Sequence, residues 1–292
     1  MIEGTLLVNS AEVETARRAF AQNVMSKTGL KNEQLLTALS EVSREDFLGP
    51  GPWQLLNPDT SYETTPDDSP IHLYQDRAVG ILPEKGLNNG QPSFLAYLIS
   101  LGRPAVGDAV VHIGCGTGYY TAIIARIIGN RGTVTAVEFE PSLAERAKQN
   151  LARFPHVTVA HGDGSSMQLG AADMILVNAG ATGPAATWLE ALKDQGRLVL
   201  PLTVPFTTKD GHRMTFGGIF LIERFGDDFE ARWKSTTAIY PCVGLRDPSA
   251  EASLSAAFAA GGAERVTRLY RTSDISDDLC WARGPGWALA YS

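Results

Sequence analysis

The fold of this chain is decided by residues 110–118, which read Val-Val-His-Ile-Gly-Cys-Gly-Thr-Gly. The apolar start of this stretch predicts a buried strand. The glycines that follow, Gly114, Gly116 and Gly118, predict a tight turn whose backbone can approach a ligand closely, because no Cβ stands in the way. Twenty residues after the last glycine, a second apolar run ends in Glu138, an acid suited to bind the hydroxyls of a ribose. Together these features predict a nucleotide-like ligand at the edge of an open α/β sheet.

The glycine spacing resembles the S-adenosylmethionine loop of class I methyltransferases. A nicotinamide-binding motif would carry glycine at its sixth position, where this chain has Tyr119, so an oxidoreductase is a distant alternative. The resemblance implies that backbone N–H groups at the start of the next helix meet the carboxylate of the donor's methionine part. The implied donor-binding residues are Gly114, Cys115, Gly116, Gly118 and Tyr119 in the loop, Glu138 at the ribose, and Phe139 as an apolar plate for the adenine.

Two later strand ends add candidate residues at the same edge. The third predicted strand is followed by Asp163, which is suited to accept a hydrogen bond from the adenine amino group, and by Gly164, which gives the ring room. An ordinary Asp-Gly turn is the alternative for this pair. The fourth predicted strand ends in Asn178, two residues before Gly180. Because the carboxyl ends of parallel strands meet at one edge, we expect Asn178 to lie beside the donor and Gly180 beside the acceptor.

Strand and helix patterns alternate from residue 108 onward, which predicts a parallel sheet with helices on both faces. The predicted strands are 109–113, 133–137, 157–160, 174–177 and 197–204, and the helices between them are 120–128, 142–154 and 184–192. Beyond these we predict strands 216–223, 231–239, 265–270 and 288–291, and a helix over 250–260. Ahead of the sheet we predict a helix that starts at Ser10, a helix over 32–42 capped by Asn32, a long loop over 49–75 and a helix over 94–101.

The predicted fold class is therefore α/β, a Rossmann-like class I methyltransferase sheet with additions at both ends. We expect a helical and loop cap over residues 1–78, a donor-binding core over 79–245, and a strand-rich extension over 246–292 that packs on the core. Two tryptophans of the extension, Trp281 and Trp287, are better explained by core packing than by contact with a substrate.

The composition argues against several classes of protein. The chain has 292 residues, of which 44% are apolar and 20% charged, as in an ordinary globular protein. Its net charge of −7 argues against a nucleic-acid partner. Its three distant cysteines form no disulfide or zinc pattern, and its five histidines, His212 among them, show no metal-ligand spacing. The N-terminus lacks the features of a signal peptide and no apolar run is long enough to span a membrane. We expect a cytoplasmic protein without metal, nucleic-acid or membrane partners. The oligomeric state stays open, and a monomer is the simplest expectation.

Several segments together resemble the protein-L-isoaspartate O-methyltransferase family. They are Val-Ser-Arg-Glu-Asp-Phe-Leu at 42–48, Tyr-Gln-Asp-Arg at 74–77, Gly-Gln-Pro at 90–92, Gly-Asp-Gly at 162–164, and the stretches 173–181 and 192–201. The resemblance covers roughly residues 12–245. It implies a class I fold, S-adenosylmethionine as donor, and methylation of a carboxylate on a protein or peptide, which in the family is an isoaspartyl α-carboxylate.

The resemblance also implies where the acceptor binds. It places catalysis at Asn89 and Gly90, with Asn88, Gln91, Ser93 and Gly180 around the substrate. The family usually carries a hydroxyl residue where this chain has Gly90. A carboxylate is already ionised at pH 7 and needs no general base, so methyl transfer depends mostly on its placement in line with the methyl group. The missing hydroxyl predicts weak or absent activity on simple isoaspartyl peptides, and a gain of activity for Gly90→Ser if the acceptor is still that carboxylate.

Two other functions stay open at this point. The same donor chemistry can serve another acceptor, such as a modified peptide or a small metabolite. Alternatively, the chain binds the donor but has lost catalysis, which the glycine at position 90 would explain. A further departure is His112, where the family usually has an acid; a core histidine bonded to a neighbour and a ligand-binding histidine are both consistent with the sequence.

Overall fold

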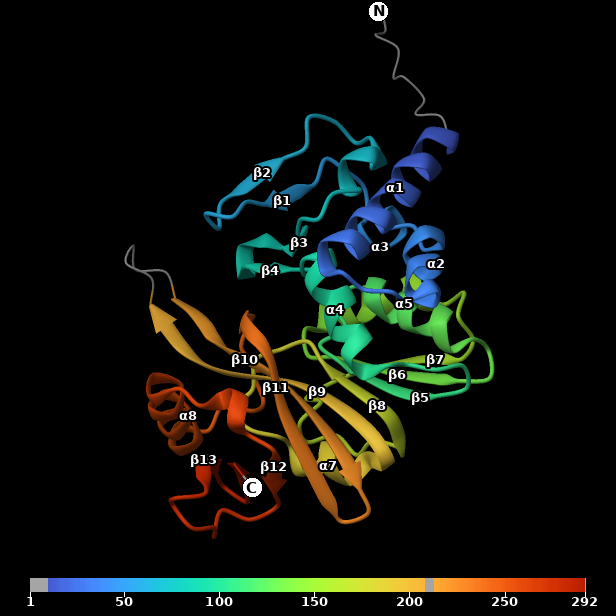
Figure 1. The fold of residues 1–292 in the computed structure, drawn as a ribbon. Coiled ribbons are helices and arrows are strands. Elements are labelled where there is room, and N and C mark those ends of the chain that lie inside the picture. Colours follow the sequence, from blue (N-terminus) through green and yellow to red (C-terminus); the bar gives the residue numbers. More distant parts are fainter. Residues whose placement is uncertain (1–9, 208–212, 292) are drawn as a thin grey trace, which may run out of the picture.

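The computed structural model describes residues 10–207 and 213–291 (Figure 1). The extreme N-terminus, on which the prediction of no signal peptide rests, and His212 lie outside the described residues. No helix within the described ranges is long and apolar enough to cross a membrane.

A ten-stranded sheet runs through the whole molecule, in the order β13-β14-β12-β11-β10-β9-β8-β5-β6-β7. The strands from β9 to β7 pair in parallel, and all pairs from β9 to β13 are antiparallel. The bounds are β5 Ala109–Ile113, β6 Thr133–Glu138, β7 Val157–His161, β8 Ala172–Val177, β9 Leu192–Thr207, β10 Arg213–Phe225, β11 Asp228–Ala238, β12 Arg268–Tyr270, β13 Cys280–Gly284 and β14 Trp287–Ala290. The predicted α/β fold class is confirmed.

Helices cover both faces of the parallel half of the sheet, because its strands are apolar on both sides. On β8, Met174 and Leu176 face one core and Ile175 and Val177 face the other, and all four are fully buried. The first core contains α4 (Pro92–Gly102), α5 (Tyr119–Ile128) and part of α6 (Pro141–Leu151). The second contains α7 (Ala186–Ala191) and α8 (Pro248–Ala260), on the opposite side of the sheet (Figure 1).

The N-terminal helices pack on the first core. They are α1 (Ser10–Thr28), α2 (Glu33–Glu41) and the short α3 (Glu45–Leu48). The predicted cap of α2 is confirmed, since Oδ1 of Asn32 accepts a hydrogen bond from the Leu35 N–H at 3.0 Å. Phe20 and Val24 of α1 are buried, as the helical spacing of its apolar residues predicts.

The prediction of a long loop over residues 49–75 is wrong. This region holds strands β1 (Gln54–Leu56) and β2 (Tyr62–Thr64), which pair antiparallel, and the 3-10 helix η1 (Pro70–Leu73). A second short hairpin follows, made of β3 (Gly80–Leu82), the 3-10 helix η2 (Pro83–Lys85) and β4 (Leu87–Asn88). Strands of two or three residues are too short to show an alternating pattern, so the sequence looks irregular there.

The C-terminal residues continue the sheet beyond the parallel half. Strand β12 pairs with β11, and β14 lies between β12 and β13. Trp281 and Trp287 are buried, and the Trp281 ring lies 5.4 Å from that of Phe220 on β10. Strand β13 was not predicted, and residues 263–265 form a 3-10 helix ahead of β12. The three proposed domains remain a prediction, although one sheet runs across the boundary at residue 245.

Candidate active site

The glycine loop follows β5 and contacts the ends of the two strands that flank it, β6 and β8. The N–H of Gly114 donates to the Val137 carbonyl at 2.8 Å, which ties the start of the loop to the tip of β6. Gly114 and Gly116 have φ angles of 75° and 57°, in the left-handed region that favours glycine. A Cβ added to Gly114 would lie 3.2 Å from the carbonyl oxygen of Asn178, just past the end of β8. The left-handed conformation therefore favours glycine at both positions, and a larger residue at position 114 would also be tightly packed.

Glu138, at the end of β6, is fixed beside the loop. Its Oε2 accepts a hydrogen bond from the Gly116 N–H at 2.7 Å, and its Oε1 accepts one from the Glu140 N–H at 3.0 Å. The side chain is buried, and burial raises its pKa, with the two N–H donors acting in the opposite direction. The ring of Phe139 is 48% exposed in the next position. A buried carboxylate next to an exposed aromatic ring is the arrangement expected for a ribose and an adenine.

The ends of β7 and β8 meet the same loop. A Cβ on Gly164 would lie 2.8 Å from Cγ2 of Ile113, so the turn after β7 packs directly on the end of β5. The Oδ1 of Asp163 accepts hydrogen bonds from the N–H and hydroxyl of Ser165, at 2.9 and 2.8 Å. The N–H of Asn178 donates to the Ile113 carbonyl at 2.8 Å. The structure thus brings together the predicted donor residues Gly114, Gly116, Glu138, Phe139, Asp163, Gly164 and Asn178.

The predicted acceptor segment is held against the helix that follows the glycine loop. Oδ1 of Asn89 accepts a hydrogen bond from the Val79 N–H at 2.8 Å, and the hydroxyl of Tyr120 donates to the Gly90 carbonyl at 3.2 Å. Tyr120 is in the first turn of α5. Asn89 is buried, and its Nδ2 has no hydrogen-bond partner among the described residues. A buried amide donor therefore lies near the start of the donor loop's own helix.

Gln91 and Ser93 are occupied by a neighbouring loop. The Ser93 N–H donates to Oδ1 of Asp76 at 2.8 Å, and Nε2 of Gln91 donates to Oδ2 at 3.2 Å. Lys27 donates to the same carboxylate at 3.1 Å. Asp76 thus caps α4 by binding the backbone N–H of Ser93 and the side-chain amide of Gln91, and these contacts help to hold the acceptor segment in place.

These segments match a known family of proteins. A family model described as "Protein-L-isoaspartate(D-aspartate) O-methyltransferase" matches residues 16–211. The chain belongs to this family. It is 31% identical over 194 residues to a protein-L-isoaspartate O-methyltransferase of Ignicoccus hospitalis, over 65% of this chain and 83% of the relative. It is 29% identical over 236 residues to the Methanothermobacter thermautotrophicus protein of the same name, over 78% and 95%.

Solved structures of the family share the fold. A protein-L-isoaspartate O-methyltransferase structure has a TM-score of 0.61 with 20% identity, over 94% of this chain and 87% of that one. A putative protein-L-isoaspartate O-methyltransferase from Plasmodium falciparum, solved with S-adenosyl-L-homocysteine, has a TM-score of 0.58 with 15% identity, over 77% and 97%. Family membership confirms the predicted resemblance, the O-methyltransferase class and S-adenosylmethionine as donor.

Some predicted donor residues do not present their side chains to the site. The ring of Tyr119 is buried against Phe47 and Tyr120, at 5.7 and 4.9 Å, so only its backbone lies at the start of α5. The thiol of Cys115 is buried and donates to the Gly116 carbonyl at 3.7 Å, and burial raises its pKa. A Cβ on Gly118 would meet Leu151 of α6, so this glycine serves helix packing.

His112 behaves as a core residue. It is fully buried on β5, and its Nδ1 lies 2.9 Å from the Thr121 hydroxyl. Burial lowers its pKa to about 4, which keeps the ring neutral. Of the two roles that the sequence allows, the core histidine bonded to a neighbour agrees with this geometry.

A buried arginine connects two of the family segments, residues 42–48 and 74–77. Arg44 is fully buried, and its guanidinium donates to the carbonyls of Leu73, Gln75 and Arg77, the last two at 2.9 and 3.2 Å. These bonds fix the loop that carries Asp76. Arg44 therefore supports the cap of α4 and, through it, the acceptor segment.

Sequence reasoning missed the segment of residues 239–247, which joins β11 to α8. The Gly180 N–H donates to the Tyr240 carbonyl at 2.6 Å, and the Cys242 N–H donates back to the Gly180 carbonyl at 2.8 Å. The hydroxyl of Tyr240 accepts a hydrogen bond from Nδ2 of Asn88 at 2.9 Å. Gly180 is thus paired with this segment, which also reaches the acceptor residues. It lies beyond the residues that the family model matches, and no local motif marks it.

Proposed function

We propose that this protein transfers a methyl group from S-adenosylmethionine to a carboxylate on a protein or peptide, with an isoaspartyl carboxylate as the first candidate. The observation that supports the proposal best is the convergence of two sets of residues on α5. The glycine loop, to which Glu138 is bonded through Gly116, leads into this helix, and the acceptor segment is bonded to its first turn through Tyr120.

The residues present fit the donor. Both carboxylate oxygens of Glu138 accept one backbone N–H each, which leaves lone pairs for the two ribose hydroxyls. Phe139 offers an exposed aromatic face to an adenine. The carboxylate of Asp163 lies at the adjoining strand end for the adenine amino group, and the N–H groups at the start of α5 are suited to the donor's carboxylate.

The chemistry needs placement rather than proton transfer. S-adenosylmethionine, when bound, supplies a methyl group on a positively charged sulfur. An ionised carboxylate oxygen of the acceptor forms the new bond to that carbon while the carbon–sulfur bond breaks, and the electron pair stays on sulfur. The products are a methyl ester and S-adenosylhomocysteine. No proton moves, so the protein contributes by holding the two reactants in line.

The free Nδ2 of Asn89 is our candidate to orient the acceptor carboxylate. It is a buried donor without a partner among the described residues, and a carboxylate is a strong acceptor for such a group. Gly90 brings no hydroxyl to this place. We therefore assign the orienting role to the amide rather than to the position where the family usually carries a hydroxyl.

One set of measurements tests the proposed function. Calorimetry with S-adenosylhomocysteine measures donor binding, and transfer of labelled methyl is measured on an isoaspartyl peptide, the same peptide with ordinary aspartate, and a cell extract. Base-labile label on the isoaspartyl peptide alone is the expected result. Failure to bind S-adenosylhomocysteine, or tight binding of NADH instead, would overturn the proposal. Label on the extract only would indicate another acceptor.

The predicted cytoplasmic location remains a proposal as well, based on three cysteines that are all free thiols.

A further inference from the structure

The segment of residues 239–247 pairs with the loop that follows β8. Besides the two bonds between Gly180 and residues 240 and 242, the Thr182 N–H donates to the Leu245 carbonyl at 3.1 Å. Gly180 and Pro241 form an isolated parallel bridge. The two loops therefore form one ordered wall at the carboxyl edge of the sheet.

This wall touches the donor residues at two places. Gly244 lies so close to Asp163 that a Cβ on the glycine would be 2.1 Å from either carboxylate oxygen. The hydroxyl of Ser165, which donates to Asp163 at 2.8 Å, also lies 3.1 Å from the Gly244 carbonyl oxygen. On the other side, the wall begins at Asn178, whose Nδ2 donates to the Gly114 carbonyl at 3.3 Å. A shift of the 239–247 segment would therefore reach both the adenine end and the glycine loop.

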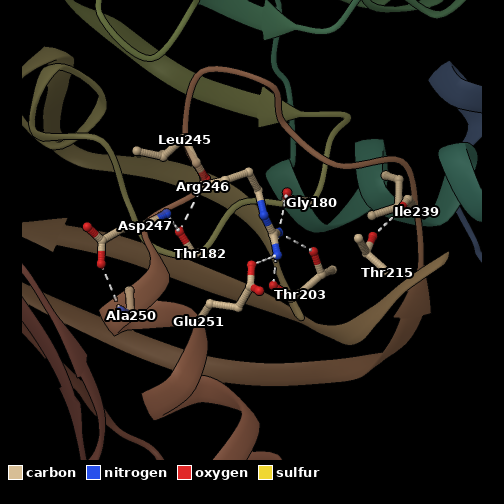
Figure 2. A network of polar contacts seen from close by, with 10 residues as sticks. All are labelled: Gly180, Thr182, Thr203, Thr215, Ile239, Leu245, Arg246, Asp247, Ala250 and Glu251. Carbon is tan, nitrogen blue, oxygen red and sulfur yellow. Dashed lines mark hydrogen bonds and ion pairs between the residues drawn. The ribbon is translucent and has the colours of Figure 1, made fainter. Parts of the chain in front are cut away.

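Arg246 fastens the wall to the sheet, as Figure 2 shows. Its Nη1 donates to the Gly180 carbonyl at 3.1 Å, and to the carbonyl and hydroxyl of Thr203 on β9 at 3.0 and 3.2 Å. The Gly180 carbonyl thus receives two donors, one from the backbone and one from the guanidinium. A Cβ on Gly180 would lie 2.2 Å from the Thr203 hydroxyl, so glycine is required for this close approach. The Arg246 side chain is only 19% exposed, which strengthens these charged hydrogen bonds.

The same arginine connects the wall to the C-terminal extension. Its Nη2 pairs with Glu251 in the first turn of α8. Asp247, the residue directly before α8, donates its N–H to the Thr182 hydroxyl at 2.8 Å. Its side chain caps the helix by accepting a hydrogen bond from the Ala250 N–H at 2.8 Å. The start of α8 is therefore held to the loop after β8 by two independent sets of bonds.

We propose that Arg246 is a positioning residue of the methyltransferase site: it fixes the 239–247 segment against Gly180 and thereby makes donor binding depend on the C-terminal extension. The inference rests on the proposed function, since it concerns the same donor site. It goes beyond that function because Arg246 and its partner Glu251 lie outside residues 16–211, the region that the family model matches, and are assigned no contact with the reactants.

The experiment compares Arg246→Met and Arg246→Lys with the wild type, well below the melting temperature of each. Affinity for S-adenosylhomocysteine is measured by calorimetry, and amide hydrogen exchange is followed in peptides that cover residues 178–182 and 240–246. We expect Arg246→Met to weaken binding about five- to tenfold, with faster exchange in both peptides. Arg246→Lys keeps the charge and should recover part of the affinity.

Arg271→Met is the matched control. Arg271 pairs with Glu190 on the surface, with both side chains largely exposed, and it belongs to the same extension. This variant should bind like the wild type. If Arg246→Met does not fold, Glu251→Gln tests the same link from the other partner. Wild-type affinity in a folded Arg246→Met or Glu251→Gln protein would overturn the inference. A wild-type protein that binds no S-adenosylhomocysteine would instead overturn the proposed function.

Discussion

Among single residues, Glu138 has two roles in the site: it fixes the glycine loop, and it carries a negative charge whose ionisation depends on pH. Its carboxylate holds the glycine loop through Gly116 and is the proposed partner of the ribose. Because burial raises its pKa from the ordinary 4.5, donor affinity should fall earlier than for an ordinary glutamate as the pH is lowered from neutrality. Calorimetry with S-adenosylhomocysteine across this range measures the effect. Glu138→Gln should cost about 1–3 kcal/mol of binding at neutral pH and lose this pH dependence.

The stability of the free protein should respond to Glu138 in the opposite direction. A carboxylate with a raised pKa in the folded state costs stability above that pKa, and the cost is relieved as the pH falls through it. Acid should therefore weaken donor binding without a loss of folding stability from this group. The same pH dependence of binding in Glu138→Gln would show that another group titrates.

Gly90 shows where the structure changes an expectation from the sequence. Its φ is 81°, and a Cβ there would lie 2.5 Å from Cδ2 of the fully buried Leu95. A gain from Gly90→Ser is therefore no longer expected. The left-handed conformation alone costs a serine about 1–2 kcal/mol, so we expect a lower melting temperature and no increase in methyl transfer. Gly90→Ala carries the same strain without a hydroxyl. Higher activity of the serine variant than of both the alanine variant and the wild type would contradict this.

Among the secondary-structure elements, the sequence predicts those with a long apolar pattern and misses those with a short one. The strands from β5 to β8 are apolar runs of five or six residues between glycines or helices, and the sequence locates each of them. Hairpin β1–β2 and strand β13 were missed, because the first has three-residue strands and the second is a short strand that ends at Gly284, just before Pro285. The N-cap at Asn32 was found because a cap depends on its own helix only.

The sequence likewise predicts one part of the donor site and not the other. Its glycine loop and Glu138 are motifs within one strand-helix-strand unit, so sequence spacing reveals them. The 239–247 segment contacts residues that are far away in sequence: Arg246 and Gly180 are 66 positions apart, and Tyr240 and Asn88 are 152 positions apart. Such contacts depend on how β9, β10 and β11 return along the sheet, which no local pattern contains.

Tyr240 provides a test of the segment's acceptor side. Its hydroxyl accepts the bond from Asn88, whose Oδ1 in turn accepts the Gly90 N–H at 2.8 Å. Tyr240→Phe removes one hydrogen bond, which is worth about 0.5–1.5 kcal/mol. We expect a higher KM for the peptide with an unchanged Kd for S-adenosylhomocysteine. Tyr97→Phe removes a hydroxyl that donates to the Lys234 carbonyl on β11 and should change neither value. Equal effects of both variants on KM would rule out the proposed role of Tyr240.

For the whole molecule, the central question is whether the C-terminal extension can be separated from the enzyme. Strand β12 pairs with β11 through Leu269 opposite Phe229, and β14 covers β12 in turn. Trp287 lies against Gly183, where a Cβ would be 2.3 Å from its Nε1, just past the loop that Arg246 fastens. The extension therefore completes both the sheet and the second core, next to the donor site.

A chain that ends at Ser249 should consequently lose more than a tail. It would expose the edge of β11 and the apolar groups that Trp281 and Trp287 cover, and an exposed apolar edge favours aggregation. It would also lack Glu251, the partner of Arg246. We expect insoluble or markedly destabilised protein without donor binding, as measured by solubility, thermal melting and calorimetry. A soluble truncated chain that melts like the full protein and binds S-adenosylhomocysteine would contradict this, and would make the extension a candidate module for recognising the acceptor.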